Sequence, residues 1–258
     1  MSEMPRRGIL GSERIPVPES GEIDAVYCLR LLRQLRDVSF ATVNEAGLPS
    51  IRIIDVMHVE GGRLYFLTAR GKAFYDELMQ KPYVAIVGMT CDLRMVRLEG
   101  WAERPTDAVE QRRLVDWMFE LNPEMEELYE GDSRYVLEVF FVERGHGEYY
   151  DLGQKPVVRV GYSIGEGGCD SLEGRFAITD GCTGCSTCAD VCPQHCISRG
   201  PDGKCEIEQS ACLGCGLCSE ECPAGAIEKR GRNDEAIKVI SHHPSKRALR
   251  RYSLGVTP

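Results

Sequence analysis

Two cysteine runs in the last third of the chain have the residue types and spacing to do chemistry. The first, CTGCSTCADVCP, extends from Cys182 to Pro193, and the second, CLGCGLCSEECP, extends from Cys212 to Pro223. Both follow the pattern C-x₂-C-x₂-C-x₃-C-P. Three thiolates of such a run converge on one cube of iron and sulfide, while the fourth reaches the other cube. The spacing therefore predicts two [4Fe–4S] clusters, which move one electron at a time.

Residues from about 175 to 229 resemble the bacterial two-cluster ferredoxins, with FAITDGCTGC and CEIEQSACLGC entering the two runs. The resemblance implies that one cluster is held by Cys182, Cys185, Cys188 and Cys222. It implies that the other is held by Cys212, Cys215, Cys218 and Cys192. We expect Gly184, Gly214 and Gly216 to keep backbone amides free for hydrogen bonds to the sulfides.

A pair of zinc knuckles is the alternative for these cysteines, but zinc sites use cysteine pairs with a longer gap between them. The other cysteines of the chain fall outside the repeated pattern. We expect four of them to be small core residues: Cys28, Cys91, Cys196 and Cys205. Cys169 has no evident role.

The composition is that of an ordinary globular protein. With 258 residues, 43% of them hydrophobic, the chain can build one large domain or two smaller ones. The net charge of −9 argues against nucleic acid as a partner. The first residues lack the apolar region of a signal peptide, and no stretch approaches the roughly 18 apolar residues of a membrane span. We expect a cytoplasmic protein that binds neither membrane nor nucleic acid.

The first half of the chain alternates strand patterns with a few helical ones. The predicted helices cover 21–36, with Ser20 as N-cap, 71–80 and 106–129. The predicted strands cover 38–43, 50–59, 63–68, 83–90, 93–104, 135–144 and 148–152. Many short antiparallel strands with few helices favour a barrel closed on itself.

The domain organisation follows from these patterns. We expect an all-β or α+β fold class: a β-barrel followed by a small α+β two-cluster ferredoxin domain. The predicted segments are an arm at 1–20, a barrel at 21–152, a linker at 153–174, a ferredoxin domain at 175–232 and a basic tail at 233–258. The tail is weakly patterned, and we expect it to pack on the surface or to be partly disordered.

The barrel segment resembles the FMN-binding split β-barrel of the pyridoxamine 5′-phosphate oxidase superfamily, over about residues 22–152. The resemblance rests on SFATVNEAGLPSIRIIDV, RLYFLTARGKAF and LRMVRLEGWAE in this order. It implies that Arg52, Thr68 and Lys72 grip the FMN phosphate and ribityl chain. It assigns backbone contacts and pocket walls to Ile53, Ile54, Asp55 and Leu67. The chemistry is suitable, because a phosphate dianion favours a guanidinium, an ammonium and the amides of a helix N-terminus.

Three departures separate this chain from the oxidases of that superfamily. Their substrate-contacting Lys is replaced by Met57, their flavin-side Gln by Met95, and their C-terminal Trp and Arg segment is missing. Oxidation of a pyridoxamine phosphate is therefore not expected. Members of the superfamily are usually homodimers with FMN at the subunit interface, so the resemblance implies a homodimer here.

FMN accepts two electrons together and releases them singly, so a flavin joined to two one-electron clusters can convert between the two modes. The leading hypothesis is an FMN-dependent oxidoreductase whose clusters relay electrons between an external low-potential partner and the flavin, where a small substrate reacts. The alternatives are an electron-transfer protein that serves a partner enzyme, or a barrel without flavin used as a sensor or haem binder. No general acid is evident, and Arg94, Arg97 and Tyr65 are candidates only for lining the pocket.

Overall fold

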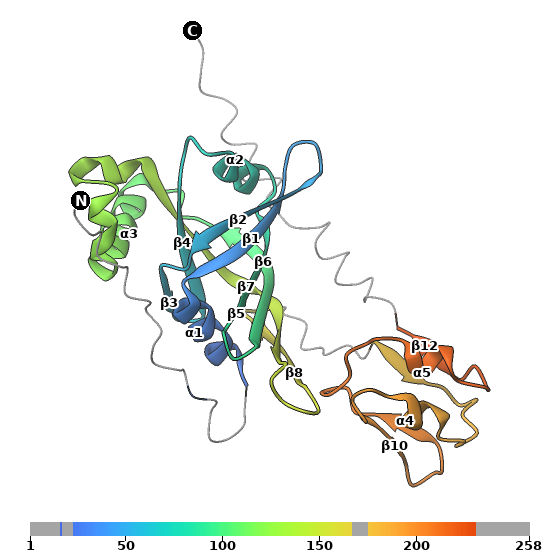
Figure 1. Ribbon diagram of the computed structural model, residues 1–258. Coiled ribbons are helices and arrows are strands. Elements are labelled where there is room, and N and C mark those ends of the chain that lie inside the picture. Colours follow the sequence, from blue (N-terminus) through green and yellow to red (C-terminus); the bar gives the residue numbers. More distant parts are fainter. Residues whose placement is uncertain (1–15, 17–22, 167–174, 231–258) are drawn as a thin grey trace, which may run out of the picture. The chain divides into compact units, whose positions relative to one another are not determined.

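The computed structural model describes residues 16, 23–166 and 175–230, which form two compact units (Figure 1). The first unit extends to Leu172 and the second begins at Glu173. The predicted basic tail, most of the predicted N-terminal arm and Cys169 lie outside the described residues. Within the described part of the chain, no helix is long and apolar enough to cross a membrane.

In its described residues, the first unit contains three α-helices, two short 3₁₀ helices and eight strands. The helices are α1 (Ala25–Leu35), α2 (Ala73–Gln80), α3 (Ala108–Leu121), η1 (Pro123–Glu127) and η2 (Gly131–Val136). The strands are β1 (Asp37–Val43), β2 (Pro49–Asp55), β3 (His58–Glu60), β4 (Arg63–Ala69), β5 (Tyr83–Met89), β6 (Arg94–Glu103), β7 (Leu137–Asp151) and β8 (Val158–Ile164).

These strands form one antiparallel sheet in the order β2-β1-β5-β6-β7-β4-β3, with β8 paired to β7. The sheet curls strongly, so that β2 and β4 come near each other although they are far apart in the strand order (Figure 1). This is the split barrel that the sequence predicts. The long strand β7 is central to it, because β4, β6 and β8 all pair with it.

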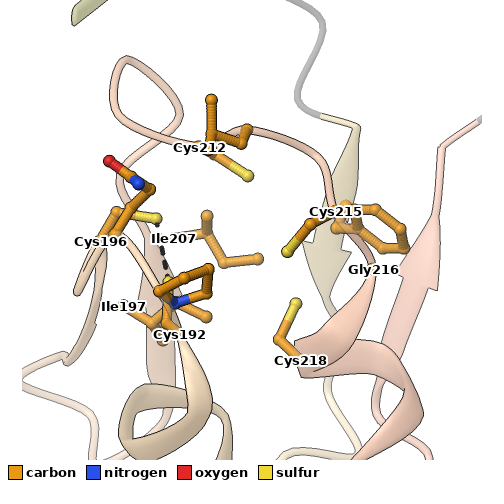
Figure 2. Close-up of a pocket in the computed structure, with 12 residues that line it drawn as sticks. Cys192, Cys196, Ile197, Ile207, Cys212, Cys215, Gly216 and Cys218 are labelled. Carbon is orange, nitrogen blue, oxygen red and sulfur yellow. Dashed lines mark hydrogen bonds between the residues drawn. The ribbon is translucent and has the colours of Figure 1, made fainter. Parts of the chain in front are cut away.

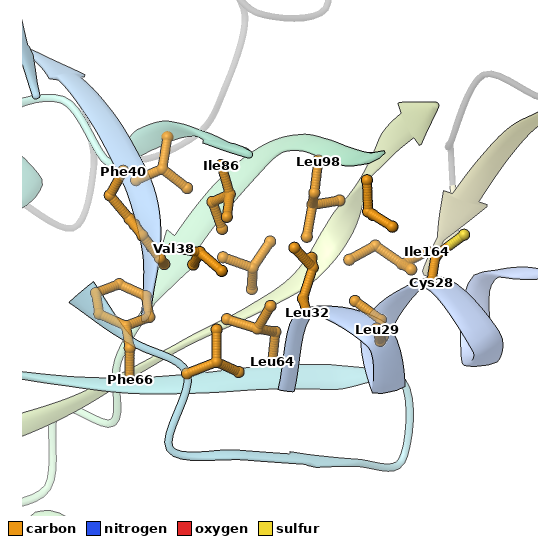
Figure 3. Close-up of a cluster of buried hydrophobic side chains, with 14 of the residues drawn as sticks. Cys28, Leu29, Leu32, Val38, Phe40, Leu64, Phe66, Ile86, Leu98 and Ile164 are labelled. Atoms are coloured by element: carbon orange, nitrogen blue, oxygen red, sulfur yellow. The ribbon is translucent and has the colours of Figure 1, made fainter. Parts of the chain in front are cut away.

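Helix α1 supplies one side of the barrel core. Asp24 caps it, since its side chain accepts a hydrogen bond of 2.7 Å from the N–H of Tyr27. The helix therefore begins at Ala25, whereas the sequence predicted a start at Gly21. Leu29 and Leu32 then pack against Leu64 and other buried side chains of the sheet (Figure 3). Complete burial of each such leucine contributes about 1.5–3 kcal/mol.

The structure has one strand, β7, where the sequence predicted two strands, 135–144 and 148–152. Gly145, His146 and Gly147, which separate the two predicted strands, lie inside this continuous strand. Gly145 stands opposite Gly100 of β6, and a Cβ on Gly145 would lie 2.2 Å from the carbonyl oxygen of Glu99. A Cβ on Gly147 would lie 2.1 Å from the carbonyl oxygen of Arg97. These glycines are thus required by the close approach of two strands.

Three other sequence predictions also need correction. The predicted strand 50–59 is divided into β2 and β3, because the N–H groups of Val56 and Met57 turn away from the ladder to the carbonyls of Arg36 and Tyr65, at 2.8 Å each. The predicted helix 106–129 ends at Leu121, two residues before Pro123. Residues 153–174, predicted as linker, contain β8, whose Tyr162 and Ile164 are buried in the barrel core.

The second unit is a small α+β fold of two similar halves. Its elements are β9 (Phe176–Ile178), α4 (Thr187–Val191), β10 (Ile197–Arg199), β11 (Cys205–Ile207), α5 (Leu217–Glu220) and β12 (Ile227–Lys229). β10 pairs with β11, and β9 pairs with β12, so the first strand of the unit lies beside the last. This pairing brings the end of the second cysteine run to the beginning of the first.

The substitution Gly147→Ala tests whether β6 and β7 need their close approach. It should lower the free energy of unfolding of the barrel by about 1–3 kcal/mol, because the new methyl group would overlap the Arg97 carbonyl and the Tyr162 ring. Gly71→Ala is the matched control, since a Cβ there meets nothing within 4 Å. The chain's two tryptophans, Trp101 and Trp117, both lie in the barrel, so urea unfolding followed by their fluorescence reports on this unit. Equal midpoints for the two variants would contradict the prediction.

Candidate cofactor sites

Two pockets in the second unit gather the cysteines of both runs. The first pocket is lined by Cys192, Cys196, Cys212, Cys215 and Cys218. Figure 2 shows the sulfurs of its cysteines turned toward one common space. That space has an empty volume of about 350 Å³, part of it open to solvent.

The second pocket is lined by Cys182, Cys185, Cys188, Cys205 and Cys222, around about 300 Å³ of partly open space. Cys192 therefore lies with the run that begins at Cys212, and Cys222 lies with the run that begins at Cys182. This grouping is the one expected if the fourth cysteine of each run is exchanged between two clusters.

Backbone amides point at the sulfurs of three cysteines in these pockets. The N–H of Cys205 donates to Cys182 Sγ at 3.4 Å, that of Gly214 to Cys212 Sγ at 3.4 Å, and that of Ala226 to Cys222 Sγ at 3.3 Å. Such hydrogen bonds stabilise thiolates. Accordingly, the N–H groups of Cys205 and Gly184 lower the pKa of Cys182.

Glycine is required at two turns of the cysteine runs. Gly184 has φ of +70°, and a Cβ there would lie 2.2 Å from the carbonyl oxygen of Gly203. Gly214 has φ of +66°, and a Cβ there would lie 2.3 Å from Cδ of Arg175. A side chain at either position would push the turn away from the pocket.

The donor set of each pocket fits an iron–sulfur cluster. In the described parts of the chain, no three His, Cys, Asp or Glu side chains are placed to hold a metal ion. The cysteines of each pocket instead surround a space, as a group larger than an ion requires. All twelve described cysteines are free thiols, so none of these sulfurs is used in a disulfide.

The predicted phosphate residues of the barrel lie around helix α2. Arg52 extends from β2 toward this helix, and its Cζ lies 4.6 Å from the ring centroid of Phe74. Its Nη2 forms an ion pair of 2.6 Å with Glu77, a buried carboxylate of α2, and its Nη1 donates to Thr42. Burial works against ionisation of Glu77, yet hydrogen bonds from Thr42 and Ser50 and the Arg52 guanidinium hold its pKa below the usual value.

Thr68 and Lys72 make the other side of this site. Thr68 is 2% exposed, and its Oγ1 is a buried hydroxyl without a hydrogen-bond partner among the described residues. Lys72 is the N-cap of α2 but offers no side-chain cap, so the first amides of the helix are left for another acceptor. A hydroxyl without a partner, an ammonium and an uncapped helix N-terminus suit an anion such as phosphate. Arg52 fits less simply, because it would share its guanidinium with Glu77.

The remaining predicted cofactor residues do not lie on one face of the barrel sheet. Ile54 and Leu67 are half-buried and pack against the two apolar clusters of the barrel. Asp55 forms an ion pair of 3.4 Å with Arg36. Ile53 is 61% exposed, on the outer face of β2.

The structure also reassigns several residues that the sequence suggested. Arg94 is buried in a hydrogen bond to Tyr27 and an ion pair with Asp92, so its role is structural. Tyr65 is buried beside Trp117, with ring centroids 5.5 Å apart. Cys91 is exposed and not a core residue, whereas Cys28 is fully buried as expected.

Sequence reasoning missed two buried acidic residues at the barrel site. Glu77 partners Arg52, as described above. Glu138 stands opposite Thr68 in the β4–β7 ladder and accepts hydrogen bonds from Arg104 at 2.8 Å and Tyr75 at 3.1 Å. The position of Glu77 in an amphipathic helix pattern gave no sign that its carboxylate faces Arg52.

Comparison with known families identifies both units. Residues 28–142 match the family described as "Pyridoxamine 5'-phosphate oxidase", and residues 181–226 match the "4Fe-4S dicluster domain". The chain joins a pyridoxamine 5′-phosphate oxidase-like barrel to a 4Fe–4S dicluster domain. No curated protein gives a significant match.

Similar solved structures cover about half of this chain. One is a NimC/NimA family protein from Clostridium acetobutylicum, 22% identical, which covers 54% of this chain and 92% of its own, with a TM-score of 0.47. Another is a pyridoxamine 5′-phosphate oxidase-related FMN-binding protein from Nostoc punctiforme, 16% identical, which covers 55% of this chain and 87% of its own, with a TM-score of 0.39. At such identities and TM-scores, neither likeness extends to activity.

The predicted role of the Thr68 hydroxyl in cofactor binding can be tested by two measurements, the stability of the cofactor-free barrel and its affinity for FMN. Thr68→Val should leave the stability of the cofactor-free barrel unchanged or raise it, because a buried hydroxyl without a partner costs about 1–3 kcal/mol. The same change should weaken FMN binding by about 10- to 100-fold, the value of a hydrogen bond to a charged group. Calorimetric titration and thermal unfolding measure the two effects, and Thr68→Ser, which keeps the hydroxyl, is the control. A Thr68→Val variant with unchanged FMN affinity would contradict the assignment.

Proposed function

We propose that the protein is an FMN-dependent oxidoreductase in which two [4Fe–4S] clusters relay single electrons to or from the flavin, where a small substrate reacts. The observation that carries this proposal is the presence, in one chain, of two cysteine pockets and a pyridoxamine 5′-phosphate oxidase-like barrel. The buried Thr68 hydroxyl, which has no hydrogen-bond partner among the described residues, supports an anion site near α2. FMN exchanges electrons in pairs or singly, whereas each cluster exchanges one. The combination therefore suits conversion between one-electron and two-electron carriers.

In this proposal the chain's own residues hold the two kinds of cofactor. Thr68, Lys72 and the first amides of α2 bind the phosphate of FMN, and Arg52 contributes while it remains paired with Glu77. Four cysteines of the first pocket hold one cluster: Cys192, Cys212, Cys215 and Cys218. Four cysteines of the second pocket hold the other: Cys182, Cys185, Cys188 and Cys222. FMN supplies hydride or electron transfer when it is bound. The external partner is a low-potential donor or acceptor, and the free thiols suit the reducing cytoplasm.

A homodimer is part of the proposal, and the outer face of the sheet supports it. Ile51 and Ile53 of β2 are 72% and 61% exposed, and Met89 of β5 is 53% exposed. Between them, Ala41 of β1 stands opposite both Ile51 and Ala85, so the face is apolar and has small side chains at its centre. A second copy of the chain would cover this face and enclose Ile53, which the superfamily resemblance assigns to the cofactor site.

Anaerobic purification tests the cofactor content. We expect about eight irons, about eight sulfides and about one FMN per chain, because each pocket accepts one four-iron cluster and the barrel one flavin. Iron and sulfide analysis, flavin extraction and spectra before and after reduction give these numbers. A barrel without flavin would contradict the oxidoreductase, and about four irons would contradict the second cluster.

Turnover measurements on the protein with its cofactors bound distinguish the proposed oxidoreductase from an electron-transfer protein that has no substrate of its own. A chemical reductant is supplied, and a small molecule such as a nitroaromatic or a quinone is added. Steady oxidation of the reductant only when this molecule is present would support catalysis at the flavin. If instead the protein is reduced, turns over none of a broad panel of such molecules and is reoxidised rapidly only by a partner enzyme, the electron-transfer role replaces the proposed one.

The dimer prediction uses Ile51, an exposed residue of this apolar face. Ile51→Asp should weaken dimerisation by about 100-fold or more, because a carboxylate buried without a partner costs several kcal/mol. Val109→Asp is the matched control, since Val109 is an exposed aliphatic residue of α3, 77% exposed and away from this face. Sedimentation equilibrium of the wild type and both variants provides the measurement. A monomeric wild type, or a dimer unaffected by Ile51→Asp, would refute this interface.

A further inference from the structure

Each cysteine pocket is lined by five cysteines, one more than a cubane cluster needs for its irons. The additional cysteine is Cys196 in the first pocket and Cys205 in the second. Both lie outside the C-x₂-C-x₂-C-x₃-C-P runs, and both are buried, at 7% and 4% exposure. Figure 2 shows Cys196 beside Cys192 at the edge of the first pocket.

One hairpin delivers both additional thiols. Cys196 directly precedes β10, at the open end of the β10–β11 hairpin, and Cys205 opens β11 opposite Arg199, near the turn. The hairpin thus extends from one pocket to the other. A single strand pair thereby places one thiol at each of the two sites.

The other half of the unit shows that packing alone does not require cysteine at these positions. Ala226 follows Cys222 by four residues, as Cys196 follows Cys192, and it lines the second pocket. Phe176 opens β9, as Cys205 opens β11, and it lines the first pocket. Alanine and phenylalanine thus occupy the equivalent positions in the half-repeat, and the two cysteines add a polar S–H group there.

The additional cysteines lie among the predicted cluster ligands. Cys196 Sγ lies 3.5 Å from Cys192 Sγ, within hydrogen-bond distance for sulfur. Cys205 lines the second pocket together with Cys182 and Cys188, and its backbone N–H donates to Cys182 Sγ at 3.4 Å. A cysteine bound to iron is a thiolate and has no proton to give, so the additional thiol is the donor in each pair.

We infer that Cys196 and Cys205 are S–H hydrogen-bond donors to the ligands of the two clusters, one for each, and that they raise the reduction potentials of these clusters. Reduction adds one electron and hence one negative charge, which a hydrogen bond to the ligand sulfur stabilises. No bond forms or breaks in this step, and the thiol keeps its proton. The electron comes from the external donor. The inference rests on the proposed function, in which both pockets hold clusters.

The experiment compares alanine with serine at each position in the full chain purified without oxygen. Cys196→Ala should lower the potential of one cluster, and Cys205→Ala that of the other. The expected shift in the reduction equilibrium is about tenfold, which is about 59 mV for a one-electron couple. Cys196→Ser and Cys205→Ser should keep the potential at or above the wild-type value, because a hydroxyl is a stronger donor. Cys91→Ala, at an exposed cysteine of the barrel, should shift neither cluster.

Iron and sulfide content and the electron paramagnetic resonance spectrum of each reduced variant are measured beside the potentials. Wild-type iron content in every variant, with shifts confined to one cluster, supports the inference. Alanine variants with unchanged or raised potentials would overturn it. So would loss of about four irons in both variants at one position, because that residue would then be a ligand or essential to the fold.

If the alanine variant at one position loses its cluster and the serine variant keeps it, the serine variant provides the test. A reduction potential of its cluster below the wild-type value then overturns the inference. A wild type without clusters would instead contradict the proposed function. The iron analysis distinguishes that failure from a failure of the hydrogen-bond role.

Discussion

The close backbone contact between β6 and β7 is the constraint on which the barrel depends. Gly100, Gly145 and Gly147 allow the two strands to approach where any side chain would overlap a carbonyl group. The contact keeps β7 continuous from Leu137 to Asp151, so one strand can pair with β6 and β8 in its second half and with β4 in its first. That pairing places the end of β4, with Thr68, at the beginning of α2.

The second unit depends on a different constraint, the exchange of cysteines between its halves. Pairing of β9 with β12 brings Cys222 to the first run, and the connection after α4 brings Cys192 to the second. The buried cluster of this unit consists largely of cysteines, with few large apolar side chains among them. A unit this small buries little apolar surface, so cluster binding and folding are expected to be coupled.

Sequence patterns predicted the features that follow from local chemistry. The cysteine spacing indicated the two pockets, and strand alternation indicated β1, β4, β5 and β6 nearly to the residue. The sequence predictions for β7 and β8 were wrong, because the sequence alone does not distinguish a glycine needed for close strand packing from a glycine needed for a turn. It also missed the partnership of Arg52 with Glu77, which depends on how α2 lies across the sheet. Likewise, the position of Cys196 and Cys205 at the pockets depends on a hairpin whose two ends meet different pockets.

The proposed function requires that the clusters and the flavin exchange electrons within one molecule. The direct measurement is an anaerobic stopped-flow experiment in which the protein with its cofactors bound is mixed with a one-electron reductant, and cluster bleaching and flavin absorbance are followed together. We expect the clusters to be reduced first and the flavin to follow at a rate independent of protein concentration. Flavin reduction whose rate rises in proportion to protein concentration, or a flavin that stays oxidised beside reduced clusters, would contradict it.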